Sequence, residues 1–123
     1  AGIQKEQVGY INAHGTGTPL NDSIETTAIK KCFGEHSKNL LVSSTKSMTA
    51  HMLGAAGALE ALLSVKALNT GIALPTIGLI KEGEGCDLDY VKGKSRPMST
   101  EYALSNSFGF GGHNSSLLIK KGE

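Results

Sequence analysis

Residues 53–69 read LGAAGALEALLSVKALN, a run of small and aliphatic side chains with few polar interruptions. Apolar residues occupy nearly every side of a helix of this length, which predicts a buried helix over 53–69, ended by Gly71. Aromatic residues make up only 5% of the chain, whereas 16 residues are glycine. We therefore expect a core of Ala, Leu, Ile and Val side chains between closely packed backbones.

Length, charge and cysteine usage restrict the function classes. A chain of 123 residues with a formal net charge of +1 is expected to form one domain, and nothing indicates a nucleic-acid partner. No apolar run approaches the ~18 residues of a membrane span, and the start, AGIQKEQ, lacks a secretory signal pattern. Cys32 and Cys86 lack metal-ligand spacing, so we expect two reduced thiols and no metal site in a cytoplasmic protein.

Hydrophobic periodicity and turn residues predict alternating strands and helices. Residues 20–36 predict a helix with Asp22 as N-cap, Glu25 completing a capping box and Gly34 ending it. The predicted strands and extended segments are 8–15, 39–45, 72–78, 101–108 and 114–121, with turns at 81–89 and 109–113. This order indicates the α/β class, with a mixed β-sheet packed with helices.

The segment NAHGTGTPLND places His14 at a strand end, before two Gly-Thr pairs. Strand ends in α/β proteins are common ligand sites, and the hydroxyls of Thr16 and Thr18 are available for contacts. A turn with a structural histidine is the alternative interpretation. A nucleotide site is not indicated, because neither a dinucleotide fingerprint nor a phosphate-binding loop is present.

Lys46 and His51 flank the entry to the predicted helix 53–69. The start of a helix is partly positive, which lowers the pKa of a nearby imidazole, and a neutral imidazole can donate one N–H to an oxyanion. Glu60 lies farther along this helix, and a buried carboxylate needs a partner, for which Lys46 is the candidate. A surface lysine and a packed histidine are the alternative.

The segment NSFGFGGHN joins the last two predicted strands through a glycine-rich hairpin carrying Phe108 and Phe110. Glycines allow backbone angles that other residues resist, and the N–H groups of such a turn can bind an oxyanion. A simple hairpin with two aromatic side chains is the alternative.

Together, NAHGTGTPLNDSIE, SSTKSMTAHMLGAAGALEA, DLDYV and NSFGFGGHNSSLLI resemble the β-ketoacyl-acyl carrier protein synthases, in particular the elongating type II enzymes. The resemblance implies a thiolase-like fold of two similar halves, with residues 1–123 as most of the C-terminal half. The N-terminal half, with the nucleophilic cysteine, lies outside this chain. Ala50 stands where the family usually has glycine, and Gly17 where serine is common.

The resemblance also implies roles for individual residues. It makes His14, His51 and Lys46 catalytic, with Phe108 as the gate whose backbone N–H joins the oxyanion hole. Thr16 and Thr18 become the threonines that bind the pantetheine arm, and the structural acidic partners are Glu60, Glu25 and Asp22. No cofactor is implied, because the substrates carry phosphopantetheine on acyl carrier protein. The implied partners are that carrier protein, the missing half and a second copy in a homodimer, in the cytoplasm or in a eukaryotic plastid or mitochondrion.

Three alternatives accompany this interpretation: a non-catalytic partner subunit similar to a chain-length factor, a polyketide ketosynthase, and a stand-alone domain that binds pantetheine thioesters. Retention of both histidines and of Lys46 argues against the first. We expect the isolated chain to be inactive and to expose apolar surface where the missing half packs.

Overall fold

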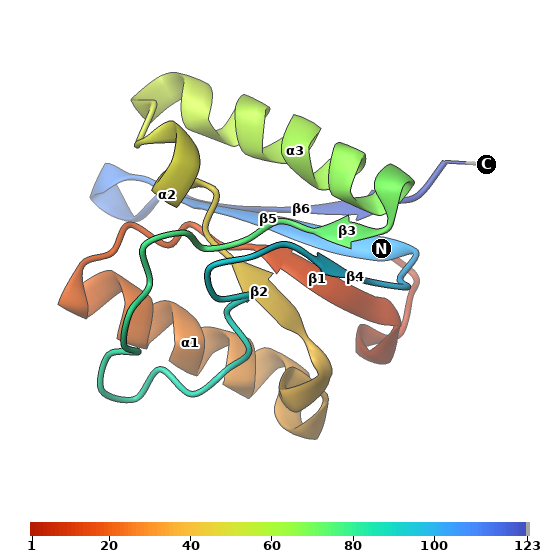
Figure 1. The fold of residues 1–123 in the computed structure, drawn as a ribbon, viewed down its shortest axis with the longest axis horizontal. Helices are drawn as coiled ribbons and strands as arrows, with labels where there is room; N and C mark the ends of the chain where they lie inside the picture. The colour runs from red at the N-terminus through yellow and green to blue at the C-terminus, as the bar shows by residue number, and fades with distance from the viewer. Residues whose placement is uncertain (123) are drawn as a thin grey trace.

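A computed structural model describes residues 1–122, in which one mixed sheet separates two long helices (Figure 1). The sheet has the strand order β2-β1-β5-β6, with β1 parallel to β2 and β5, and β6 antiparallel to β5. Its strands are β1 (Val8–Asn12), β2 (Leu41–Ser43), β5 (Tyr102–Phe108) and β6 (Asn114–Lys120). The predicted α/β class and mixed sheet are confirmed.

Helix α1 (Pro19–Phe33) covers one face of the sheet and α3 (Ala56–Thr70) the other. The remaining elements are short: the 3-10 turns η1 (Lys5–Gln7), η2 (Gly34–Asn39), η3 (Leu53–Ala55) and η4 (Phe110–Gly112), the helix α2 (Lys46–Thr49), and the pair of strands β3 (Ile72–Ala73) and β4 (Arg96–Pro97). Within residues 1–122, no helix has both the length and the apolar composition to cross a bilayer.

Alternation along β1 divides the core into two clusters, one on each face of the sheet. Ile11 and Ala13 pack with Ile29 and Phe33 of α1, whereas Tyr10 packs with Leu68 of α3. The pairing of β1 with β5 shifts register between Val8 and Tyr10, so Val8 joins the cluster on the α1 face. Gly9 lies at this shift, and a Cβ there would be 2.6 Å from Cβ of Thr100.

The predicted start of α1 was wrong. Thr18, and not Asp22, is the N-cap: its side chain accepts the N–H of Asn21 at 3.3 Å, and Pro19 is the first helical residue. Proline suits this position because its φ is already helical and the missing N–H has no partner there. The predicted stop at Gly34 is confirmed, since Gly34 has φ 58° and its N–H donates to Lys30 O.

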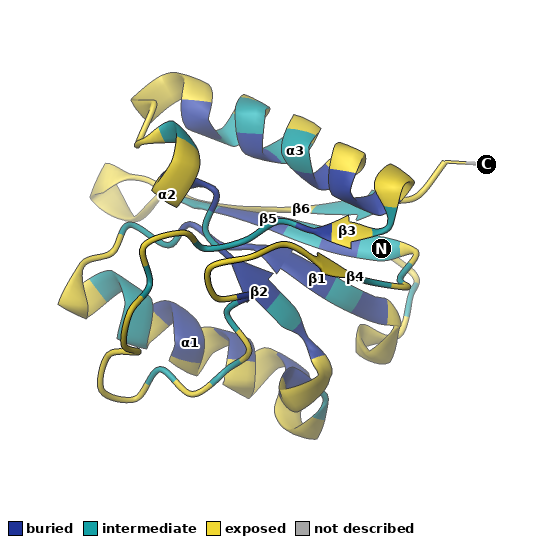
Figure 2. Cartoon of the chain, viewed as in Figure 1, coloured by how far each residue is buried: buried dark blue, intermediate teal, exposed yellow. Residues whose placement is uncertain are grey.

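The helix predicted over 53–69 forms, but it is not buried all round. It begins as η3, continues as α3 from Ala56, and ends at Gly71 with φ 67°. The face toward the sheet is small and polar, formed by Ala56, Glu60, Ser64, Ala67 and Leu68. Leu62, by contrast, is 67% exposed, and Figure 2 shows that the side of α3 away from the sheet is largely open. Leu68 is therefore part of the core, whereas Leu62 faces away from the sheet.

Replacing Thr18 tests the capping of α1. Thr18→Ala removes the oxygen that accepts the Asn21 N–H, and we expect a loss of about 1 kcal/mol in the free energy of unfolding, measured by urea titration. Thr27→Ala is the matched control, because Thr27 is exposed within the same helix and its hydroxyl bonds only to Ser23 O. Equal losses in the two variants would contradict the capping role.

Candidate functional site

His14 follows directly after β1, and a single carboxylate holds its backbone. Glu25 of α1, only 3% exposed, accepts the N–H of His14 at 3.0 Å through Oε1 and the N–H of Gly15 at 2.9 Å through Oε2. Asn106 Nδ2, from β5, donates to the same Oε1 at 3.2 Å. Glu25 is therefore not part of a capping box: it anchors the loop that carries His14 to both α1 and β5.

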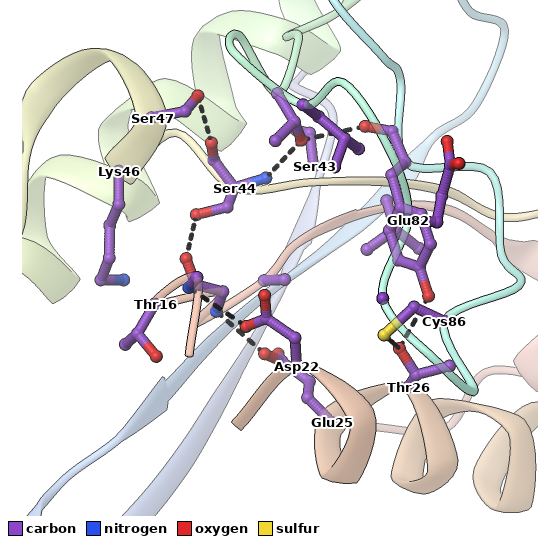
Figure 3. A pocket seen from close by; sticks show the side chains of 18 of the residues that line it. Thr16, Asp22, Glu25, Thr26, Ser43, Ser44, Lys46, Ser47, Glu82 and Cys86 are labelled. Carbon is purple, nitrogen blue, oxygen red and sulfur yellow. Dashed lines mark hydrogen bonds between the residues drawn. The ribbon is translucent and has the colours of Figure 1, made fainter. Parts of the chain in front are cut away.

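The rest of this loop is held by Asp22, whose Oδ1 accepts the N–H of Gly17 at 3.2 Å. Figure 3 shows Asp22 and Glu25 together beneath the loop, beside Thr16. The hydroxyls of Thr16 and Thr18 are 3.1 Å apart, with Thr16 half-buried and Thr18 exposed. Both hydroxyls remain within reach of a molecule that enters along this loop.

Lys46 begins α2 immediately after the end of β2, and its ammonium group donates to Glu60 of α3. Both residues are buried, at 8% and 2% exposure, so the ion pair expected from the sequence is present. Asn12 Nδ2 donates to Glu60 O at 3.2 Å and joins β1 to the same group. Within residues 1–122, Glu60 Oε2 has no hydrogen-bond partner.

His51 lies between α2 and η3, and its backbone surroundings fix its tautomer. The N–H of Leu53 donates to His51 Nδ1 at 3.1 Å. A neutral imidazole that accepts at Nδ1 carries its proton on Nε2. The exposed edge of His51 is therefore a hydrogen-bond donor without needing a second proton.

The side chains of His14, His51 and Phe108 converge from three separate segments. The ring centroids of His14 and His51 are 5.5 Å apart at an interplanar angle of 84°, and those of His14 and Phe108 are 5.4 Å apart. Burial, reinforced by the positive charge of Lys46 and by His51, lowers the pKa of His14 to about 4, against an opposing effect of Asp22. His14 is thus neutral at pH 7, and this corner holds two imidazoles close to the buried ammonium group of Lys46.

A cavity of about 390 Å³ adjoins this ring cluster and shares Lys46 and His51 with it. It lies between the loop 15–17, α1, and the segment 76–90, and His14 and Phe108 do not line it (Figure 3). Its apolar wall consists of Ala13, Ile29, Val42, Ile77, Leu79 and Tyr90. No role was predicted for residues 76–86, which read as an extended segment and a polar turn.

Two serines connect the elements around the cavity. Ser44 Oγ donates to Gly15 O at 2.6 Å, and Ser47 Oγ accepts the N–H of Ile77 at 3.0 Å. The sequence analysis missed these contacts, since each joins residues that are distant along the chain. Topology alone places the end of β2 beside the end of β1.

Neither cysteine belongs to the ring cluster. Cys32 is exposed on α1, and Cys86 lines the cavity, where Thr26 Oγ1 donates to its sulfur at 3.8 Å. Over residues 1–122, no three or more His, Cys, Asp or Glu side chains gather as metal ligands. The described residues thus supply hydrogen-bond donors and charge around the site, and neither thiol lies beside the paired imidazoles.

The titration of His14 tests the electrostatics of this corner. We expect its ring to titrate near pH 4, read from the ring C–H resonances by NMR and assigned with His14→Asn. In the unfolded chain the imidazole of His14 titrates near pH 6.5, so between pH 6.5 and 4 it binds a proton in the unfolded state but not in the folded state. His14 therefore destabilises the fold progressively as the pH falls from about 6.5 to 4. A midpoint at or above 6.5 would contradict the proposed burial.

Comparison with known proteins identifies the family. Residues 1–79 match the family described as "Beta-ketoacyl synthase, C-terminal domain". A relative named 3-oxoacyl-[acyl-carrier-protein] synthase 2, from Coxiella burnetii, is 57% identical over 121 residues, which are 98% of this chain and 29% of the relative. The chain thus spans less than a third of that relative.

Solved structures show the same fold. The ishigamide ketosynthase/chain length factor aligns with a TM-score of 0.94 at 33% identity, over 99% of this chain and 30% of that one. A type II PKS ketosynthase in complex with its acyl-carrier protein aligns with a TM-score of 0.94 at 35% identity, over 98% of this chain and 30% of that one. The predicted thiolase-like fold is confirmed, and the chain belongs to the β-ketoacyl synthase family, whose C-terminal domain it carries.

Proposed function

We propose that the complete protein is a 3-oxoacyl-[acyl-carrier-protein] synthase. It performs the decarboxylative Claisen condensation of malonyl-ACP with an acyl-enzyme thioester in fatty acid elongation. The observation that carries this proposal is the convergence of His14 and His51, whose ring centroids are 5.5 Å apart. Family membership and 57% identity to a 3-oxoacyl-[acyl-carrier-protein] synthase 2 support it.

The first step creates negative charge that two N–H donors can stabilise. The bond between the malonyl carboxylate and the α-carbon breaks, CO₂ leaves, and the electron pair forms an enolate with charge on the thioester oxygen. His51 donates from Nε2, because Leu53 occupies Nδ1, and the lowered pKa of His14 keeps that ring neutral. Each such donor contributes about 3 kcal/mol to the stability of the transition state.

The second step needs a group from outside this chain. The enolate carbon attacks the carbonyl of an acyl group held on a cysteine, a tetrahedral oxyanion forms, and the thiolate leaves. We assign the cysteine to the part of the protein that precedes these residues, because Cys32 and Cys86 lie apart from the ring cluster. The same assignment makes the isolated chain inactive.

The remaining residues position these groups. Lys46 adds positive charge next to the imidazoles, and the ion pair with Glu60 fixes where that charge lies. The hydroxyls of Thr16 and Thr18 are placed to bind the pantetheine arm that the carrier protein supplies, so the enzyme needs no cofactor of its own. Phe108 packs against His14 and acts as gate, with its backbone N–H in the oxyanion hole.

A second candidate is a polyketide ketosynthase or a chain-length-factor subunit without chemistry. The structural likeness to the ishigamide ketosynthase/chain length factor favours it. Sequence identity favours fatty acid elongation, since the value is 57% for the synthase 2 relative against 33% for that structure. A cysteine at the nucleophile position of the preceding segment distinguishes an enzyme from a chain-length factor.

A chimera tests the proposed chemistry. This chain replaces the matching C-terminal segment of the Coxiella burnetii relative, and malonyl-ACP decarboxylation is measured separately from acyl transfer to the cysteine. We expect His14→Ala and His51→Ala each to lower decarboxylation by about 10²–10³-fold, because each removes one donor to the enolate. Acyl transfer is expected to change far less.

His36→Gln is the matched control, because the ring of His36 bonds to Val8 O at the opposite end of β1. Phe108→Ala and Phe110→Ala belong in the same series: Phe108 contacts His14, whereas Phe110 is 99% exposed at the hairpin tip. A chimera that elongates acyl-ACP with both histidines removed would refute the proposal.

The exposed apolar face of α3 predicts self-association of the isolated chain. Leu62 is 67% exposed and Val65 40% on α3, and Leu53, just before it, is 72% exposed. We assign this face to contact with the preceding half of the complete protein. Sedimentation at several concentrations is expected to show a rising mean mass, and Leu62→Glu/Val65→Glu is expected to reduce it. A monomer at all concentrations would contradict the expectation.

A further inference from the structure

Two residues other than glycine have left-handed backbone angles on either side of His51. Ala50 has φ 59° and ψ 179°, and Leu53 has φ 50°. The combination at Ala50 belongs to a region that glycine alone occupies readily, since a Cβ crowds the adjacent backbone there. Strained residues of this kind persist only where the surrounding structure holds them.

Hydrogen bonds hold Ala50 in this conformation from both sides. Its N–H donates to Lys46 O at 2.9 Å and closes α2, and its carbonyl shares the hydroxyl of Thr49 with the carbonyl of Thr45, each at 3.1 Å. The Ala50 side chain is exposed, so its methyl gains no burial that offsets the strain. The methyl group thus opposes the very turn that directs His51 toward His14.

We propose that Ala50 makes the His51 turn a strained, two-state element. In the observed state, His51 faces His14 and receives the N–H of Leu53. In the second state, residue 50 relaxes to negative φ, the next peptide plane rotates, and His51 withdraws from His14. The effect on catalysis rests on the proposed function, whereas the strain rests on the backbone angles of Ala50 and Leu53 alone.

Two variants at position 50 separate strain from other effects of the methyl group. Ala50→Gly removes both the methyl and the strain. D-alanine keeps the methyl but prefers positive φ, since its allowed angles mirror those of L-alanine. It can be introduced by ligating synthetic segments at Cys32 and Cys86. Ala58→Gly is the matched control, because Ala58 is exposed within α3 and has no such strain.

The experiment measures the urea midpoint of the 123-residue chain and the exchange of the His51 ring by ¹⁵N relaxation dispersion. Both variants at position 50 are expected to raise the midpoint, by on the order of 0.5 M, and to reduce ring exchange at His51. Ala58→Gly is expected to lower the midpoint, because glycine weakens a helix interior. A purely structural role would move the midpoint without changing the ring exchange.

The proposal is overturned if either variant at position 50 leaves the midpoint unchanged or lower, or if His51 exchange persists in both. In the chimera, Ala50→Gly is expected to raise the rate of malonyl-ACP decarboxylation. The largest possible increase is 1/f, where f is the fraction of molecules with Ala50 that are in the observed state. If the chimera shows no decarboxylation that depends on the histidines, the proposed function fails. The midpoint and ring measurements still decide the strain, because they need no substrate.

Discussion

The buried carboxylate of Glu25 links α1, the loop after β1, and β5 through hydrogen bonds. It accepts the backbone N–H groups of His14 and Gly15 and the side-chain amide of Asn106, which in turn accepts the hydroxyl of Ser116. A carboxylate taken out of water is stable only with such donors around it. Because these contacts join the loop after β1 to β5 and, through Asn106, to β6, the position of His14 follows from the assembly of the sheet.

A second polar group on the other face of the sheet places Lys46. The ion pair with Glu60 lies under α3, where Asn12 donates to Glu60 O and Thr45 donates to Asn12 Oδ1 at 3.2 Å. The small residues of α3 allow this close approach: a Cβ at Gly57 would be 3.3 Å from the hydroxyl of Ser107. The face of α3 toward the sheet therefore carries this ion pair together with the buried side chains of Ala67 and Leu68, while Leu62 and Val65 are exposed.

Separate contacts orient the two imidazoles in the observed structure. Glu25 fixes the backbone of His14, while Leu53 fixes the tautomer of His51 through its N–H. Neither of these two contacts requires a charged imidazole, and burial favours the neutral form of His14. Strain at Ala50 is the opposing element, because it acts on His51, the member of this pair that no buried carboxylate holds.

The sequence by itself was sufficient for the class, the main order of strands and helices, and the stops at Gly34 and Gly71, and it named His14, Lys46 and His51 as candidates. These features depend on local periodicity, on the positions of glycines and on short motifs, so they can be recognised without knowledge of the tertiary structure. The start of α1 was predicted wrongly because the spacing of Asp22 and Glu25 matches that of a capping box. The helix instead begins at Pro19, with Thr18 as its N-cap.

Only the tertiary structure decided which partners the buried charges have and which face of α3 is covered. Glu25 pairs across 81 positions with Asn106, and Ser47 pairs across 30 with Ile77, so no local pattern could reveal either contact. Leu62 is as apolar as Leu68, yet only Leu68 is buried. That difference depends on the direction in which the helix meets the sheet, which is set by packing and not by composition.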